Sequence, residues 1–169
     1  MTTHAVRHDQ TALVLPRWLI AGFISGAVSV LLFHQGAAAL LHALALTPRA
    51  PYSMNFTAPL GIPQTGSLAF WGGVWGVLLA AMLARIHGAA FIVGAAVFGA
   101  ALPTLVAWFV VAPLKGQPAA AGFVPMAMAI GPIVNAAWGL GTGLGLVLLG
   151  QPHPRPRGEA VGMRRARRW

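Results

Sequence analysis

Four long apolar stretches, separated by short segments rich in proline, glycine or charge, set the pattern of this chain. They cover about 18–46, 67–84, 88–111 and 125–149. A helix of about 20 apolar residues crosses the core of a bilayer, so each stretch predicts one transmembrane helix. The first stretch is longer than this, and we expect it to tilt or to project beyond the hydrocarbon. The pattern predicts an all-α, polytopic membrane protein with four transmembrane helices.

The composition supports this class and argues against catalysis. Of 169 residues, 57% are hydrophobic and 8% are charged, whereas the surface of a soluble domain needs roughly a quarter of its residues charged. The chain has no cysteine, which excludes disulfides and thiolate nucleophiles or metal ligands. The two acidic residues, Asp9 and Glu159, lie near the termini. Because neither can reach a site inside the membrane, we expect no enzyme activity.

The basic residues predict the orientation of the helices. If four spans alternate, Arg49 and Lys115 lie on one side of the membrane and the other basic residues lie opposite. Those are Arg7, Arg17, Arg85, Arg155, Arg157, Arg164, Arg165, Arg167 and Arg168. Cytoplasmic loops carry the excess of Lys and Arg, so both termini and the 85–88 turn are expected in the cytoplasm. The net charge of +9 follows this topology, and we expect no nucleic-acid partner.

Three regions follow from these boundaries. Residues 1–17 form a cytoplasmic N-terminal segment, 18–150 the transmembrane domain, and 151–169 a proline-rich, basic tail too polar to build a core. Basic side chains beside a membrane attract anionic lipid headgroups. In the tail the candidates are Arg164, Arg165, Arg167 and Arg168. Docking of another protein on the tail is the alternative.

A faint internal repeat links the two halves of the domain. The stretch FWGGVWG at 70–76 resembles IVNAAWG at 133–139, and a Trp-Gly pair closes both. This similarity predicts a two-fold repeat of a two-helix unit. Both copies would have the same orientation, unlike the inverted repeats of many transporters. Chance recurrence in a chain rich in tryptophan and glycine is the alternative.

Small residues at helical spacing predict where the helices touch. In a membrane, helices associate by close backbone approach at pairs of small residues four apart. Such pairs are Gly22/Gly26, Gly72/Gly76, Gly139/Gly143 and Gly141/Gly145, and the third helix offers Gly94, Ala95 and Gly99. We interpret these as packing contacts within the chain, with a dimerisation face as the alternative. Pro103 and Pro132 are expected to kink their helices.

Four polar side chains lie in or beside the predicted spans: His34, Gln35, His42 and Asn135. Polar groups inside a membrane are costly and are candidates for function. Measured from Arg17, His34 lies about 25 Å and His42 about 37 Å along a straight helix. One interpretation is structural, with His34 and Gln35 bonding across to Asn135. The other is a polar transport path lined by all four.

These polar residues make a poor binding site for a cofactor or a metal ion. Two histidines on one helix cannot ligate opposite faces of a haem iron, so only a single axial ligand from His34 to a haem or other pigment stays open. A metal site at the outer end would have to add Met54, Asn55 and Gln64, which is a weak ligand set. We therefore predict no metal and no cofactor.

The outer loop at 47–66 combines four prolines with apolar side chains. Its prolines exclude a regular helix. We expect the loop to fold back over the outer face of the bundle, where it covers the region of His34 and His42. It would act there either as a lid or as an interfacial loop anchored by aromatic residues.

The stretches FHQG at 33–36 and FWGGVWG at 70–76, joined by a proline-rich loop, resemble small, uncharacterised bacterial inner-membrane proteins. The resemblance covers about 18–85 and implies the bacterial inner membrane but no activity. The function predicted is a non-catalytic accessory or scaffold subunit, whose partners are lipid and either other membrane subunits or further copies of the chain. The alternatives are a small channel or transporter along His34, Gln35 and Asn135, and a haem- or pigment-binding subunit ligated by His34.

Overall fold

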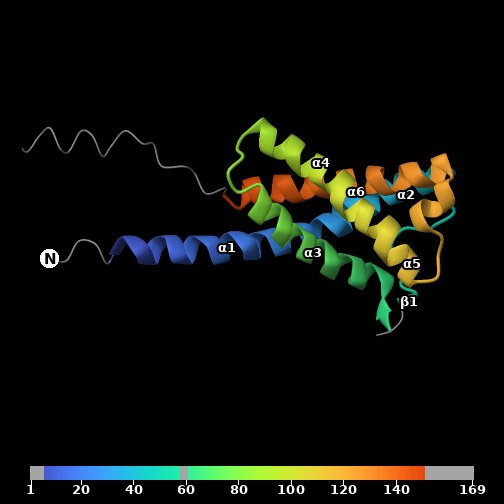
Figure 1. Ribbon diagram of the computed structural model, residues 1–169, viewed down its shortest axis with the longest axis horizontal. Helices are drawn as coiled ribbons and strands as arrows, with labels where there is room; N and C mark the ends of the chain where they lie inside the picture. The colour runs from blue at the N-terminus through green and yellow to red at the C-terminus, as the bar shows by residue number, and fades with distance from the viewer. Residues whose placement is uncertain (1–5, 58–60, 151–169) are drawn as a thin grey trace, which may run out of the picture.

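The computed structural model describes residues 6–57 and 61–150 (Figure 1). The first membrane-crossing helix consists of α1 (Val6–Ser29), the π-helical turn η1 (Val30–His34) and α2 (Gln35–Ala43). A short hairpin of β1 (Phe56–Thr57) and β2 (Ile62–Pro63) precedes α3 (Gln64–Met82). The third crossing consists of α4 (Ala89–Val106), the π-helical turn η2 (Ala107–Val111) and α5 (Ala112–Leu114). The 3₁₀ turn η3 (Ala119–Phe123) leads into α6 (Pro125–Leu148).

Four helices are long and apolar enough to cross a membrane: Arg17–Ala43, Gln64–Met82, Ala89–Leu114 and Pro125–Leu148. The prediction of an all-α, four-span membrane protein is therefore confirmed. The helices run alternately in opposite directions (Figure 1). The β1–β2 hairpin and η3 lie at one end of the bundle, called the hairpin end below. The connection between α3 and α4, residues 83–88, lies at the other end with the end of α6, called the turn end.

Two boundaries differ from the sequence pattern. Helix α1 begins at Val6, well before the apolar span, and its first turns project beyond the other helices at the turn end (Figure 1). The third span was predicted to end at about residue 111, but the helix continues to Leu114. A proline is tolerated in the first turn of a helical segment, where its missing N–H has no helical partner to lose. Pro113 occupies that position in α5, directly after the turn η2.

Helices α1 and α3 form one closely packed pair. An added Cβ at Gly26 would overlap the carbonyl oxygen of Gly72 and lie 3.0 Å from the Cα of Gly76. A Cβ at Gly76 would in turn overlap the carbonyl oxygen of Gly22. Backbone meets backbone at this crossing, so only glycine fits these positions. The structure thus places all four predicted packing glycines of these helices at the contact.

Helices α4 and α6 form a second pair with the same pattern of contacts. A Cβ at Gly99 would overlap the carbonyl oxygen of Asn135 and lie 3.0 Å from the Cα of Gly139. A Cβ at Gly139 would overlap the carbonyl oxygen of Ala95, and one at Gly143 would lie 2.9 Å from the Cβ of Ala95. Both pairs therefore cross at small residues in the same register, as a duplicated two-helix unit with one orientation requires.

Replacing Gly99 by alanine is expected to lower the free energy of unfolding by roughly 1–3 kcal/mol, the usual cost of overpacking a close contact. The new methyl group would meet the rigid backbone of Asn135. Gly94→Ala in the same helix is the control, because its Cβ would meet only the flexible side chain of Leu83 at 3.7 Å. Unfolding in detergent micelles, followed by circular dichroism, compares the two variants. Equal stabilities would contradict the close contact.

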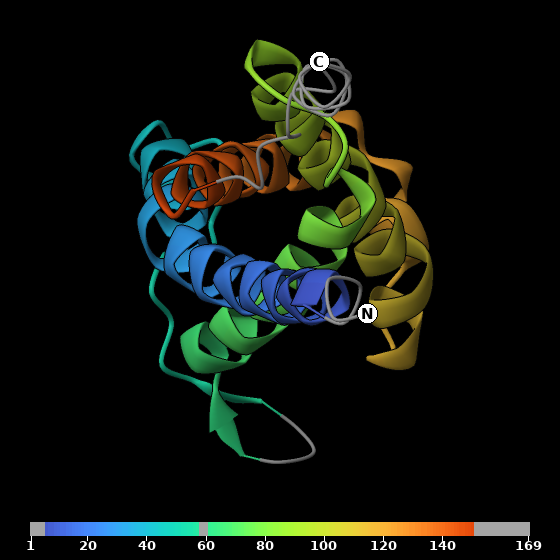
Figure 2. The ribbon, with the colours of Figure 1, turned by 90° about the vertical axis from the view of Figure 1, so that its left-hand side faces the viewer.

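The two pairs are joined through α1 and α6 by a buried hydrogen-bonded cluster. The Ser29 hydroxyl donates to the carbonyl oxygen of Trp138 at 2.6 Å, and Thr142 donates to the same oxygen at 2.8 Å. The Trp138 indole N–H donates to the carbonyl oxygen of Gly26 at 2.9 Å. An added Cβ at Gly72 would lie 3.2 Å from this indole nitrogen. Trp138 therefore ties α6 to the crossing of α1 and α3, which lie side by side in Figure 2.

The contact between α3 and α4 is built differently. Trp75 and Phe98 meet there edge to face, with ring centroids 6.1 Å apart, whereas α1 approaches the glycines of α6 through Ser25 and Ser29. Large rings hold α3 and α4 apart, and small residues let α1 and α6 come close. The two halves therefore share their internal packing but differ in how each contacts the other.

Candidate functional site

The first span contains a π-helical turn, η1, which is followed directly by the buried polar side chain of Gln35. A π-helical turn widens the helix by one residue and is often found at functional sites. Here the N–H of Gln35 bonds to the carbonyl oxygen of Val30, five residues earlier. The Gln35 side chain is buried, with 4% of its surface exposed. A buried amide needs hydrogen-bond partners, and the outer loop supplies one.

Tyr52 of the outer loop binds η1 and the first residue of α2 through two hydrogen bonds. Its backbone N–H donates to Oε1 of Gln35 at 2.7 Å, and its hydroxyl donates to the carbonyl oxygen of Leu31 at 2.8 Å. Tyr52 has a φ of 53°, a conformation that costs a residue with a side chain about 1 kcal/mol or more. The two bonds hold it there. This part of the loop lies against Leu31 and Gln35, whereas the β1–β2 hairpin projects sideways from the bundle (Figure 2).

Replacing Tyr52 by phenylalanine should free the carbonyl oxygen of Leu31 and loosen the loop. The loss of one such hydrogen bond is worth about 1 kcal/mol. We expect faster amide hydrogen exchange in η1 and faster protease cleavage of the loop. The control is Trp71→Phe, in which the altered side chain lies on the exposed face of α3. Exchange in η1 that matches the unsubstituted protein would show that the hydroxyl does not hold the loop.

His34 lies at the end of η1 and differs from its neighbours. Its Nδ1 atom is buried and has no hydrogen-bond partner, a property it shares with the Ser25 hydroxyl. Among the residues that the structure describes, no group of three or more His, Asp or Glu side chains could hold a metal ion. Within residues 6–57 and 61–150, His34 therefore belongs to no metal-binding cluster.

His42 lies at the end of α2 and closes the helix. Its Nδ1 atom hydrogen-bonds to the carbonyl oxygen of Thr47 at 3.0 Å. The N–H of Leu46 donates to the carbonyl oxygen of Leu41 at 2.9 Å in the same turn. The imidazole thus fixes the chain as it leaves the helix.

Asn135 lies in the second helix pair and bonds within it. Its Nδ2 atom donates to the Thr104 hydroxyl of α4 at 2.9 Å. The expected link from His34 and Gln35 to Asn135 is absent from the hydrogen bonds of the described residues, because Gln35 is engaged by Tyr52 instead. Among the described residues, no hydrogen bond joins Asn135 to His34, Gln35 or His42.

The turn η2 gives the second pair its own π-helical segment. It begins four residues after Pro103, and the N–H of Ala107 bonds to the carbonyl oxygens of both Pro103 and Thr104. Because a proline has no N–H and crowds the turn that precedes it, the proline placed to disturb this segment is Pro113, two residues after η2, and not Pro103. Both π-helical turns lie in the hairpin-end halves of their spans, and Tyr52 forms hydrogen bonds with Leu31 of η1 and with Gln35.

Sequence reasoning missed three residues that organise these contacts: Tyr52, Thr104 and Trp138. Tyr52 is the single tyrosine of the chain, and its place in a proline-rich loop was the available signal. The four tail arginines predicted to bind lipid headgroups, Arg164, Arg165, Arg167 and Arg168, lie outside the described residues.

The fold defines an integral membrane protein with four helices long and apolar enough to cross a membrane. Comparison with protein families, curated proteins and solved structures finds no match to this chain.

Proposed function

We propose that this protein is a non-catalytic accessory or scaffold subunit of a membrane assembly in a bacterial inner membrane, with both termini in the cytoplasm. One observation carries the proposal: most polar side chains within the spans are bonded inside the chain. These are Ser29, Gln35, Asn135, Trp138 and Thr142. Groups used in this way fix the helices relative to one another and leave few free for chemistry.

The orientation rests on charge. Arg17 and Arg85 lie at the turn end of the described spans, and most of the remaining arginines lie in the two terminal segments that join the bundle there. Arg49 and Lys115 belong to the segments at the hairpin end. An excess of positive charge on one side indicates the cytoplasmic side. The turn end would therefore face the cytoplasm.

Affinity purification in a mild detergent, from membranes of the native host, tests the accessory role. Mass spectrometry then identifies the proteins that copurify, with untagged cells as the control. A stoichiometric set of larger membrane proteins is the expected result. Isolation of the chain alone, as a monomer or homo-oligomer with an activity of its own, would contradict the proposal.

Transport is the second candidate, and one observation favours it: the buried Nδ1 atom of His34 has no partner. An imidazole can carry protons near neutral pH. Proton flux into vesicles that contain the pure protein and a pH-sensitive dye is the measurement. His34→Ala should abolish the flux, and Leu40→Ala, exposed in the same span, should leave it unchanged. Flux that survives His34→Ala would exclude this path.

Pigment binding by His34 is the third candidate. The visible absorption spectrum of protein purified from its native membrane tests it directly. A haem or chlorin band that disappears in His34→Ala would support this role, and a spectrum without visible bands would exclude it.

A further inference from the structure

The β1–β2 hairpin carries exposed apolar side chains at the hairpin end of the bundle. Met54 is 65% exposed, Phe56 78% and Ile62 41%. Large apolar groups exposed together mark a surface that contacts a protein, a ligand or a membrane. The direction in which the hairpin extends decides between these.

The hairpin is held firmly to the start of α3. The first N–H groups of a helix have no partner within it, and here the loop supplies them. The N–H of Gln64 donates to the carbonyl oxygen of Asn55 at 2.9 Å, and that of Thr65 donates to Ser53 at 3.1 Å. The Thr65 hydroxyl donates to the same Ser53 oxygen at 2.8 Å. The direction of the hairpin is therefore fixed by the helix.

The two short strands also satisfy much of their own polar backbone. Phe56 pairs with Pro63 and Thr57 pairs with Ile62 in antiparallel register. The Thr57 hydroxyl donates to the carbonyl oxygen of Ile62 at 2.9 Å, and the N–H of Gly61 donates to Thr57 at 2.9 Å. Paired backbone groups reduce the cost of bringing a segment against lipid.

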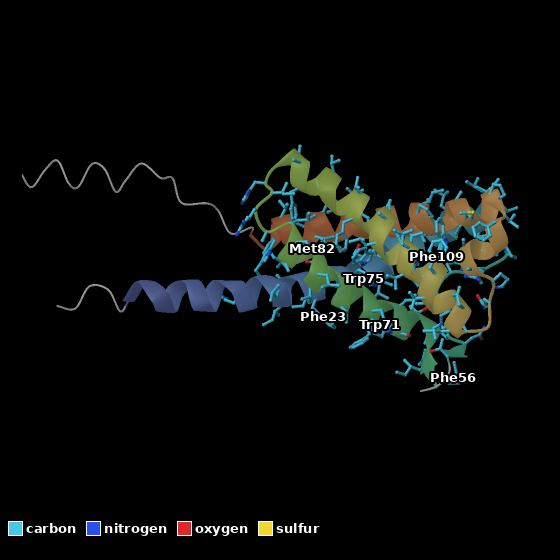
Figure 3. The ribbon with its side chains drawn as sticks, in the orientation of Figure 1. Phe23, Phe56, Trp71, Trp75, Met82 and Phe109 are labelled. Carbon is cyan, nitrogen blue, oxygen red and sulfur yellow. The ribbon has the colours of Figure 1, made fainter. Side chains whose placement is uncertain are left out.

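The hairpin extends sideways from the bundle, across its long axis (Figures 1 and 2). A membrane normal along that axis would place the hairpin parallel to the membrane plane, next to the start of α3. Phe56 and Trp71 lie along the same edge of the molecule (Figure 3). Trp71 and its neighbour Phe70 are exposed on α3, within a span. The apolar surface of the hairpin thus continues the membrane-facing surface of α3.

We propose that the β1–β2 hairpin is a lipid-binding element that lies in the headgroup region of the membrane surface at the hairpin end. Phe56, Met54 and Ile62 contact the upper acyl chains, as aromatic and apolar residues do at membrane interfaces. The partner is the bilayer surface, and the hairpin fixes the depth and tilt of α3. This inference depends on the fold and not on the accessory role proposed above.

Site-directed spin labelling tests the position of the hairpin in the full-length protein. The chain has no natural cysteine, so Phe56→Cys carries a single nitroxide. The labelled protein is reconstituted into vesicles of phosphatidylethanolamine and phosphatidylglycerol. Power saturation then measures collision with oxygen, which concentrates in lipid, and with a water-soluble nickel chelate. We expect high oxygen accessibility and nickel accessibility several-fold lower than at an aqueous reference site.

Two matched variants calibrate the measurement. Gln117→Cys, on the exposed segment between α5 and α6, is the aqueous reference. Val97→Cys, 61% exposed within the third span, is the lipid reference. Nickel accessibility at Phe56 equal to that at Gln117 would place the hairpin in water and overturn the proposal. Low accessibility to both reagents would also overturn it, because it would show the hairpin buried against protein. Met54→Cys repeats the test at a second position.

Discussion

Gly26→Ala is expected to separate α1 from α3 and to lower the free energy of unfolding by about 3 kcal/mol, the upper part of the range for overpacking. The added methyl group would overlap the carbonyl oxygen of Gly72 and press on the Cα of Gly76. Both obstacles are backbone, so no side chain can rotate away. The carbonyl oxygen of Gly26 also accepts the Trp138 indole N–H. Displacement of α1 therefore strains the contact with α6 as well.

Gly36→Ala provides the matched control for this substitution. Gly36 lies in the same span, and an added Cβ there would meet nothing within 4 Å. Alanine is the better helix former, so this variant should be neutral or slightly more stable. Both variants are measured by unfolding in mixed micelles of mild detergent and dodecyl sulfate, followed by circular dichroism. A loss in Gly36→Ala as large as in Gly26→Ala would show that the effect is not contact-specific.

Trp138→Ala is expected to lower the free energy of unfolding by roughly 3–5 kcal/mol, the usual cost of removing a large buried aromatic side chain. The indole packs at the meeting point of α1, α3 and α6 and donates to the carbonyl oxygen of Gly26. Its removal leaves a cavity and an unpaired carbonyl group. Trp138→Phe keeps most of the volume and loses the hydrogen bond, so a loss of about 1 kcal/mol is expected.

Trp71→Ala is the control for the loss of an indole, because Trp71 is exposed on the outer face of α3. Its effect should be small in detergent, since it removes no contact between helix pairs. The same unfolding measurement serves for all three variants. If Trp138→Phe were as unstable as Trp138→Ala, the hydrogen bond would dominate over packing. If Trp71→Ala matched Trp138→Ala, the proposed junction would be wrong.

The spans could be predicted from the sequence because lipid imposes a simple rule. Backbone polar groups must be bonded within each segment, so length and hydropathy determine where the helices lie. The sequence also predicted a repeat, through Trp75-Gly76 and Trp138-Gly139. Its two tryptophans nevertheless differ in role: one donates a hydrogen bond to α1, whereas the other meets the ring of Phe98. Two residues at matching places in similar sequences can therefore contact different groups in the folded chain.

The polar contacts could not be predicted in the same way. The π-helical turn η1 changes the register of the helix beyond it, and period counting assumes a constant register. Gln35 consequently bonds to Tyr52 of the outer loop rather than to another span. Asn135 bonds to Thr104 because α4 and α6 cross at Gly99 and Gly139. The point at which two helices cross depends on both of them, so the residue pattern of one helix does not determine it.

Cysteine accessibility in intact cells tests the central claim, that the turn end and the hairpin end of the four-span bundle lie on opposite sides of the membrane, with the turn end in the cytoplasm. The variants are Ile86→Cys, in the turn between α3 and α4, and Gln117→Cys, in the segment between α5 and α6. The natural chain has no cysteine, so a membrane-impermeant maleimide reports on each position alone. We predict that Gln117→Cys reacts from outside and that Ile86→Cys reacts only after permeabilisation. Reaction of both from one side, or of Ile86→Cys alone in intact cells, would contradict this account.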